Sequence, residues 1–373
     1  MYKAFKYRLY PTKRQAELLN KHFGCCRFVY NLALNLRISR YKSEKKDTSR
    51  NELEKEVTKL KKQEEYAWLK EVNSQSLQYA LVCLDSAYKK FFKEKKGFPK
   101  YKSKRSSKQS FTAIQNTSVD FNNGLLYIPK FREGIKCVFS REFVGKICSC
   151  TISRHASGRF FASIIVEDGK ALPDRPTACE NKAIGLDLGV KTFAVCSNGE
   201  EIANPKYLRK SEKRLKHLQR KFSRTKNGSN RHEKARLALA RQYEKVTNQR
   251  EDFLHKVSTR LVKDERFDTI CLENLNIAGM VKNHHLAKYI SDCSWSKFVS
   301  MLEYKAEWYG KNILKIGRFD PSSKMCSCGY INKELKLKDR SWTCPKCGSI
   351  NNRDLVAAKN ILKFAFHPLS KIQ

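Results

Sequence analysis

The chain has 373 residues, 40% of them hydrophobic, which is enough for about two or three domains and excludes a disordered protein. Its 76 Lys and Arg residues outnumber its 37 Asp and Glu residues, and the net charge of +39 requires a polyanionic partner. We find no apolar run of bilayer-spanning length and no signal-peptide core, so we expect no membrane partner and take nucleic acid as the polyanion.

The first residues predict one strand followed by helices. Residues 2–10 alternate between large apolar side chains and basic ones, as expected of a strand with a basic outer face. Thr12 is the predicted N-cap of the next helix, and Gln15 completes a capping box. Within residues 11–95 we expect a helix that Gly24 ends, then helices beginning near residues 28, 49 and 74. The net charge favours a bundle facing nucleic acid over one whose charges form only a solvated surface.

A basic loop and a sheet follow. The loop at residues 95–105 interleaves aromatic and basic residues, a composition typical of segments that grip a nucleic-acid backbone, although a charged surface loop is the alternative. Its candidate contacts are Lys100, Tyr101, Lys102, Lys104 and Arg105. From residue 110 to about 166 the period becomes two, which predicts an antiparallel sheet or small barrel. The strand at residues 2–10 is expected to pair with it, which makes the helical region an insertion, and residues 167–181 read as a linker.

The stretch at residues 183–192 reads as a buried strand carrying one carboxylate. Apolar side chains occupy one face, while Ala183, Gly185 and Asp187 occupy the other, which leaves room for a close approach. An unpaired Asp in an apolar strand is costly unless it binds a partner or a metal, or caps a turn at the strand end. A hairpin around Asn198 and Gly199 and two long basic helices, at residues 206–224 and 231–263, are expected next.

A second carboxylate, Glu273, ends the apolar strand that begins at Thr269. By itself such a residue is more often solvated than a ligand. A helix that Gly310 ends and a strand at residues 313–316 come after it.

Most of the 14 cysteines lie in apolar runs and are expected to be reduced and buried. The exceptions are two closely spaced pairs, the layout of a four-thiolate zinc ribbon: Cys326 and Cys328, then Cys344 and Cys347. The first pair has one residue between its cysteines instead of two. In an extended segment its thiols would point to opposite faces, so a shared metal requires an unusual turn; four reduced cysteines on a loop are the alternative.

A third carboxylate, Asp354, begins a helix with one apolar stripe, where the helix dipole favours a negative charge. Simple capping would explain this residue if it stood alone. It is, however, the third of three carboxylates that are carried on strands or begin a helix, in the order Asp187, Glu273 and Asp354.

This Asp–Glu–Asp order resembles the split RuvC active site of the RNase H-like fold, and the chain as a whole resembles the TnpB family of transposon-encoded RNA-guided nucleases, relatives of compact type V CRISPR effectors. Besides the three carboxylate segments and the cysteine ribbon, the matching segments are Tyr7-Arg8-Leu9-Tyr10-Pro11, Phe23-Gly24-Cys25-Cys26-Arg27-Phe28-Val29-Tyr30-Asn31 and Gly97-Phe98-Pro99.

The resemblance implies a multidomain α+β and α/β fold. A β-barrel-like wedge domain (residues 1–10 and 96–180, with the linker) is interrupted by a helical recognition domain (11–95). An RNase H-like RuvC domain (181–318 and 351–373) contains the inserted zinc ribbon (319–350). The implied setting is cytoplasmic, associated with the nucleoid of a prokaryotic host.

The resemblance also implies an RNA-guided DNA endonuclease with two Mg²⁺ ions held by Asp187, Glu273 and Asp354, and a structural Zn²⁺. Its implied partners are a guide RNA from the transposon end and double-stranded target DNA with a short adjacent motif. The glycines beside Asp187 are expected to give the phosphodiester clearance, and Arg353 is a candidate for holding the scissile phosphate.

Three positions depart from the family pattern: the Cys-x-Cys pair, Asn352 in place of an Asp, and Val356 in place of an Asn. None is one of the three carboxylates. They keep open the alternative of a nuclease-inactive or weakened RNA-guided DNA-binding protein that serves the transposon as an accessory or regulator. A transposase that joins strands itself is disfavoured, because the chain has no Tyr or His arrangement for strand transfer.

Overall fold

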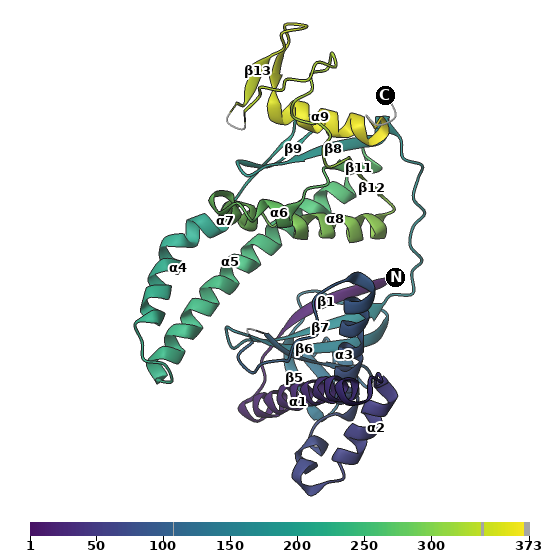
Figure 1. The fold of residues 1–373 in the computed structure, drawn as a ribbon, viewed down its shortest axis with the longest axis vertical. Coiled ribbons are helices and arrows are strands. Elements are labelled where there is room, and N and C mark those ends of the chain that lie inside the picture. The colour runs from purple at the N-terminus through teal and green to yellow at the C-terminus, as the bar shows by residue number, and fades with distance from the viewer. Residues whose placement is uncertain (107, 337–338, 369–373) are drawn as a thin grey trace. The chain divides into compact units, whose positions relative to one another are not determined.

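The structure, a computed structural model, describes residues 1–106, 108–336 and 339–368. The chain folds into two compact units, Met1–Lys170 and Ala171–Gln373 (Figure 1). Residues 337–338 of the predicted ribbon lie outside the described residues. So do residues 369–373 of the predicted C-terminal segment. Within the described residues, none of the helices combines the length and the apolar character needed to cross a bilayer.

The first unit is built on a seven-stranded sheet in the order β2-β6-β7-β1-β5-β4-β3. Its strands are β1 (Tyr2–Leu9), β2 (Lys108–Ala113), β3 (Ser118–Asp120), β4 (Leu125–Ile128), β5 (Phe131–Val138), β6 (Lys146–His155) and β7 (Phe160–Glu167). β1 pairs antiparallel with both β5 and β7, so the prediction that the helices interrupt this sheet is confirmed. β2 and β3 are its edges, which makes the sheet open in the described residues where a barrel-like closure was expected.

The inserted helices are α1 (Lys13–Glu44), α2 (Arg50–Leu60), a 3₁₀ helix (Glu64–Lys70) and α3 (Ser74–Glu94). The predicted capping box is present, since the Gln15 N–H donates to Thr12 Oγ1 and the Thr12 N–H donates to Gln15 Oε1. The prediction that Gly24 ends a helix is wrong, because α1 continues through it. A glycine inside a helix costs about 1 kcal/mol relative to alanine. Burial of the neighbouring Phe23 and Val29 in the core outweighs this cost.

The second unit is built on a five-stranded sheet in the order β10-β9-β8-β11-β12. The strands are β8 (Ala183–Leu188), β9 (Thr192–Cys196), β10 (Glu201–Ala203), β11 (Thr269–Leu272) and β12 (Asn312–Lys315). β8, β11 and β12 are parallel, whereas β9 pairs antiparallel with β8 and with β10. The predicted hairpin at Asn198 and Gly199 is confirmed, and Gly199 takes the positive φ of 89° that this turn requires.

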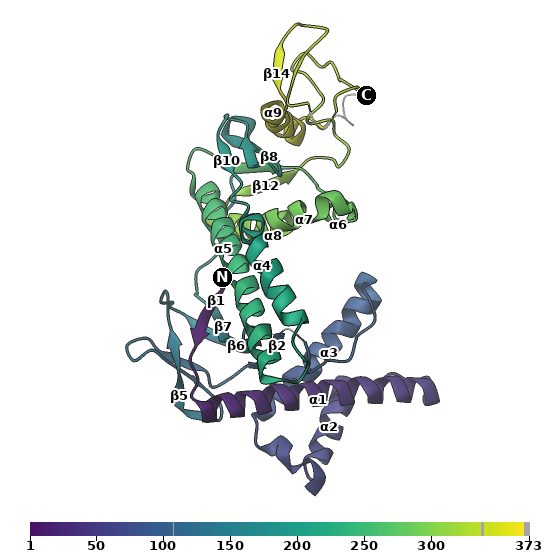
Figure 2. The same cartoon turned by 90° about the vertical axis from the view of Figure 1, so that its left-hand side faces the viewer.

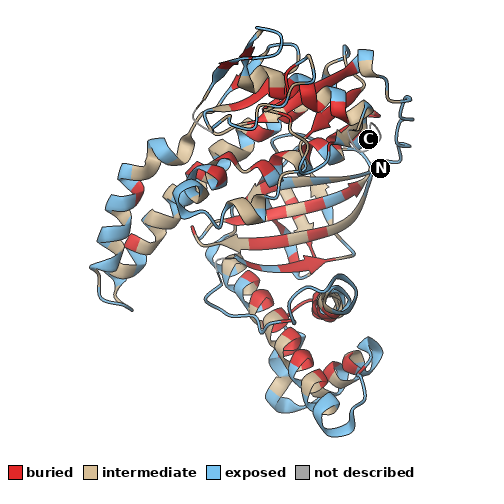
Figure 3. Cartoon of the chain, turned by 45° about the horizontal axis from the view of Figure 1, so that its top comes forward, coloured by how far each residue is buried: buried red, intermediate tan, exposed pale blue. Residues whose placement is uncertain are grey.

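Helices cover both faces of this sheet (Figures 1 and 2). The helices of this unit are α4 (Tyr207–Ser223), which extends away from the sheet in a hairpin with α5 (Figure 1), and α5 (Asn230–Lys263), α6 (Ile277–Met280), α7 (His284–Cys293), α8 (Trp295–Tyr309) and α9 (Arg353–Phe366). Ile184, Leu186 and Leu188 pack with residues of α5 and α8, whereas Ala183 packs with residues of α9 on the other face. The predicted alternation of β8 is therefore confirmed. Figure 3 shows buried residues concentrated in the strands and exposed ones along the α4–α5 hairpin.

The sequence reading missed α6 and α7. Both are short, and α7 has buried residues only near its end, at Ile290 and Cys293, so its apolar pattern is too brief to give a clear helical period. A short two-stranded sheet, β13 (Ser341–Thr343) with β14 (Ile350–Asn352), precedes α9.

Candidate functional site: a carboxylate centre beside a cysteine cluster

Two of the predicted carboxylates lie on adjacent parallel strands: Asp187 within β8, and Glu273 directly after β11. The register of β8 and β11 places Leu186 opposite Leu272. One residue further along each strand, the same register brings Asp187 opposite Glu273. Neighbouring strands lie about 4.8 Å apart, so the two carboxylates meet at the carboxyl end of these two inner strands. Both continue the face of the sheet that α9 covers.

The third carboxylate is carried to the same place by α9. Asn352 is the N-cap of this helix, and its side-chain oxygen accepts from the N–H groups of Asp354 and Leu355 at 3.1 and 3.2 Å. Asp354 lies one helical turn before Ala358, which contacts β8 at Gly185. Asp354 thus overlies the end of β8, and its charge and that of Glu273 both act on Asp187.

Gly185 serves a different purpose from the one predicted. A Cβ added to it would lie 2.1 Å from the carbonyl oxygen of Ala358 and 2.9 Å from the backbone nitrogen of Leu362. The close approach at this glycine is therefore made by α9. The expectation that it gives clearance to a phosphodiester is wrong, because a helix backbone already fills that space. Gly189 is likewise constrained from within the chain, since its Cβ would lie 2.7 Å from Thr192 O.

The centre is electrostatically crowded. Burial, together with the negative charges of Glu273 and Asp354, raises the pKa of Asp187 to about 7, although Arg353 and Arg340 lower it in part. The negative charges of the two neighbouring carboxylates thus disfavour ionisation of Asp187. A bound divalent cation would remove this conflict, and oxygen donors are the ligands that Mg²⁺ prefers. The residues present therefore fit the predicted metal centre.

Two polar residues that the sequence reading did not identify support these carboxylates. The hydroxyl of Ser322, which is buried, donates to Glu273 Oε1 at 2.5 Å, and its carbonyl accepts from Asn360 Nδ2 at 2.7 Å. Arg340 Nη1 lies 3.0 Å from Asp354 Oδ1. Neither has a recognisable spacing from its partner, because the fold brings them together from segments 49 and 14 residues apart.

Arg353, the predicted phosphate contact, begins α9, and its Nη1 donates to Lys336 O at 3.2 Å. Its contact with phosphate stays a prediction.

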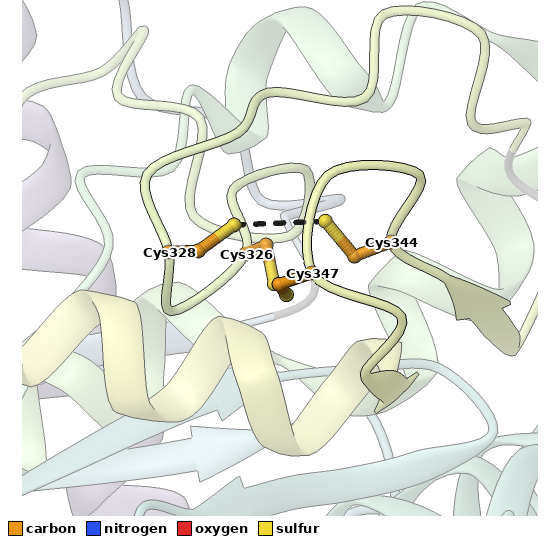
Figure 4. A group of neighbouring side chains, drawn as sticks. All are labelled: Cys326, Cys328, Cys344 and Cys347. Atoms are coloured by element: carbon orange, nitrogen blue, oxygen red, sulfur yellow. Dashed lines mark hydrogen bonds between the residues drawn. The ribbon is translucent and has the colours of Figure 1, made fainter.

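The four predicted cysteine ligands converge (Figure 4). The Sγ atoms of Cys326, Cys328, Cys344 and Cys347 all lie within 4.8 Å of one another. The hydroxyl of Ser349 lies 3.2 Å from Sγ of both Cys326 and Cys347, and this hydrogen bonding lowers the pKa of Cys326 to about 5 and also lowers that of Cys347. Four thiols that can share one ion, two of them favoured as thiolates, fit tetrahedral Zn²⁺.

A tight turn explains how the Cys-x-Cys pair contributes both thiols. In the second pair, the Cys344 N–H donates to Ser349 O and the Gly348 N–H donates to Cys344 O, each at 2.9 Å. In the first pair, the Cys326 N–H donates to Tyr330 O at 2.8 Å and the Gly329 N–H to Cys326 O at 2.9 Å. Both bonds of the first turn close a loop one residue shorter than in the second. The missing spacer residue is thus absorbed by the turn.

The predicted nucleic-acid loop lies in the first unit and is fixed to α1 by its backbone. The Lys102 N–H donates to Asn31 Oδ1 at 2.8 Å, and Asn31 Nδ2 donates back to Lys102 O at 3.0 Å. The Tyr101 hydroxyl donates to Asn35 Oδ1 at 3.2 Å. Lys100, Lys104 and Arg105 are exposed. Their contact with nucleic acid stays a prediction.

Comparison with known families and proteins gives concordant matches over most of the chain. Residues 163–284 match a family model described as "Probable transposase", residues 295–361 match "Cas12f1-like, TNB domain", and residues 1–46 match "Helix-turn-helix domain". In this structure residues 1–46 contain the strand β1 and the whole of α1, which is one continuous helix.

A protein of Streptomyces pristinaespiralis named "Putative RNA-guided DNA endonuclease" is 40% identical over 363 residues, which cover 96% of this chain and 88% of that protein. InsQ of Escherichia coli K12, which carries the same description, is 30% identical, with 96% and 91% covered. A solved Cas12f1–sgRNA–target DNA complex has a similar fold, with 13% identity, a TM-score of 0.50, and 97% of this chain and 98% of that one covered.

Proposed function

The chain belongs to the TnpB family, and on this premise we propose that it is an RNA-guided DNA endonuclease that hydrolyses phosphodiester bonds at the carboxylate centre of its second unit. The observation that carries the proposal is that Asp187, Glu273 and Asp354 meet at the carboxyl end of β8 and β11. Two of them come from these strands and the third from the start of α9. Relatives that are 40% and 30% identical over nearly the whole chain support the same activity.

The three carboxylates would hold two Mg²⁺ ions. Ions bound there supply Lewis-acid activation of the attacking water and charge stabilisation of the leaving oxygen. Ser322 holds one carboxylate oxygen of Glu273 in place by its hydrogen bond, and the N-cap at Asn352 fixes the first turn of α9 beneath Asp354. Arg340 and Arg353 would meet the negative charge of the scissile phosphate and orient it toward the carboxylates.

The partners follow from the charge and the family. A guide RNA from the transposon end would read the target by base pairing, and a short motif beside the target would be read on the DNA. The basic surface, including the loop at Lys100 to Arg105, would grip the backbones without reading sequence. The cysteine cluster would hold a structural Zn²⁺.

Sequencing of the RNA that co-purifies with the protein, followed by cleavage assays on a matching target, tests this function. We expect one discrete RNA, cleavage that requires both RNA and Mg²⁺, and loss of cleavage by at least about 10³-fold in Asp187→Ala and in Glu273→Ala, as is typical when a catalytic group is removed. Glu303→Ala is the control, because this carboxylate is paired with Lys315 on the surface of α8. Target binding without any cut by the wild-type protein would instead support the accessory, nuclease-inactive alternative.

A further inference from the structure

A cavity of about 420 Å³ lies beside the carboxylate centre. Arg340, which bonds Asp354, is part of its wall, and so is Lys191, four residues after Asp187. The volume falls in the range of about 300–1,000 Å³ that is typical of sites for small organic groups.

One wall of the cavity is apolar and belongs to α7. Leu286 and Tyr289 are three residues apart, so they share one face of this helix, and 41% and 42% of their respective surfaces are exposed. α7 is anchored in the core by Ile290, which is 2% exposed and lies one helical turn after Leu286. The aromatic ring of Tyr289 is therefore presented to the cavity from a fixed helix.

The rest of the wall is cationic. Lys191, Lys206, Arg209 and Arg340 line the cavity, and the only carboxylate among the lining residues is Asp292. That carboxylate is already engaged, because its Oδ1 accepts from the Leu208 N–H at 3.2 Å at the start of α4. Within the described residues, no ion pair engages the side chains of Lys191, Lys206 or Arg209. A ligand of this cavity should thus combine a flat apolar part with negative charge.

The floor between these walls is held by the chain itself. Asn204 Nδ2 donates to Val190 O at 2.7 Å, and Asn204 Oδ1 accepts from the Lys206 N–H at 3.0 Å. These bonds tie the segment after β8 to the segment before α4. The cations at Lys191 and Lys206 are consequently carried on two connected backbone segments.

We propose that this cavity binds one unstacked nucleotide of the DNA strand being cut, with its base on the Tyr289 ring and its phosphate among Lys191, Lys206 and Arg209. A nucleotide is flat and apolar at the base and anionic at the phosphate, as the two walls require. The bound nucleotide holds the strand so that the neighbouring phosphodiester lies at Asp187, Glu273 and Asp354. This positioning role rests on the proposed endonuclease function, whereas the binding of single-stranded DNA in the cavity does not.

Photo-cross-linking tests the binding without requiring cleavage. The full-length protein is irradiated with a single-stranded DNA oligonucleotide containing 5-iododeoxyuridine, in the absence of Mg²⁺, and the attached peptides are identified by mass spectrometry. We expect a cross-link at Tyr289 that persists in Tyr289→Phe and is lost in Tyr289→Ala. Tyr243, on α5, is the matched control because it is also 42% exposed, and Tyr243→Ala should leave the Tyr289 cross-link unchanged. Cross-links at other aromatic residues with none at Tyr289 would overturn the proposal.

An abasic scan tests the positioning. We expect removal of one base near the scissile phosphate to slow single-turnover cleavage by about tenfold, which is the usual scale for losing one stacked base. Tyr289→Ala should cause the same loss, and combining it with that abasic site should cause no further loss, whereas Tyr289→Phe should cleave normally. Losses that multiply at every position, an unchanged rate in Tyr289→Ala, or weaker guide-RNA retention in that variant would each refute the role. A wild-type protein that cuts nothing would refute the proposed function instead, and the cross-link would still decide the binding.

Discussion

At the scale of single residues, the chain shows how similar sequence signals arise from different causes. Gly24 and Gly185 both interrupt apolar patterns, and the sequence reading took one as a helix end and the other as clearance for DNA. In the structure, a Cβ on Gly24 would meet nothing within 4 Å, while one on Gly185 would overlap the backbone of α9. Sequence alone cannot separate these cases, because what approaches a glycine comes from a distant part of the chain.

This contrast predicts opposite effects of the same substitution. Gly185→Ala should lower the free energy of unfolding by about 1–3 kcal/mol, because α9 must shift to admit the methyl group. Gly24→Ala should leave it unchanged or raise it by up to about 1 kcal/mol, because alanine is the better helix former and the space is open. Chemical denaturation of the wild type and the two variants measures both changes in the free energy of unfolding. Equal effects of the two substitutions would contradict the assignment of Gly185 to helix packing.

The carboxylates were predictable to a different degree from their supports. Asp187 and Glu273 each end an apolar strand of period two, and Asp354 begins an amphipathic helix, so local patterns locate all three. Ser322 and Arg340 follow no such pattern, since their partners lie 49 and 14 residues away and only the fold defines the pairs. The sequence pattern thus locates the three carboxylates that would bind metal. It does not locate Ser322 and Arg340, which bond to two of these carboxylates.

At the scale of elements, the segment that carries the cysteine cluster is joined directly to α9. β14 follows the second cysteine turn, ends at Asn352, and continues directly into α9, which carries Asp354. Arg340, the partner of Asp354, lies just before β13 of the same small sheet. The position of the third carboxylate therefore depends on the fold of the segment that the four thiols hold together.

Loss of Zn²⁺ from the cysteine cluster should accordingly displace Asp354, although this carboxylate does not bind the zinc. We expect one Zn²⁺ per chain by elemental analysis, and its loss in Cys326→Ser and in Cys347→Ser. Cleavage should fall at least about tenfold in both variants as the start of α9 loses its anchor, a scale typical of mutations that disturb a metal site. Cys179→Ser is the control, because this cysteine is exposed and lies outside the cluster. Full zinc content in Cys326→Ser would show that the short pair contributes only one ligand.

At the scale of the whole molecule, the excess of positive charge cannot be neutralised within the chain. Even if each of the 37 acidic residues paired with one of the 76 basic residues, 39 cations would remain. Such an excess repels itself and is retained only where a polyanion is bound, which agrees with a protein that holds RNA and DNA together. The cations supply contact with backbones but carry no base-specific information.

Affinity and sequence discrimination should therefore respond differently to salt. Raising the salt concentration from 50 to 200 mM should weaken binding to random-sequence DNA by about 10³-fold or more, the loss expected for six or more phosphate contacts. The ratio of affinities for matched and mismatched targets should change little in the guided complex, because base pairing with the guide sets that ratio. Fluorescence anisotropy over a salt series measures both quantities. If discrimination fell in parallel with affinity, the protein's own cations would be reading the sequence. The assignment of sequence recognition to the guide RNA alone would then be wrong.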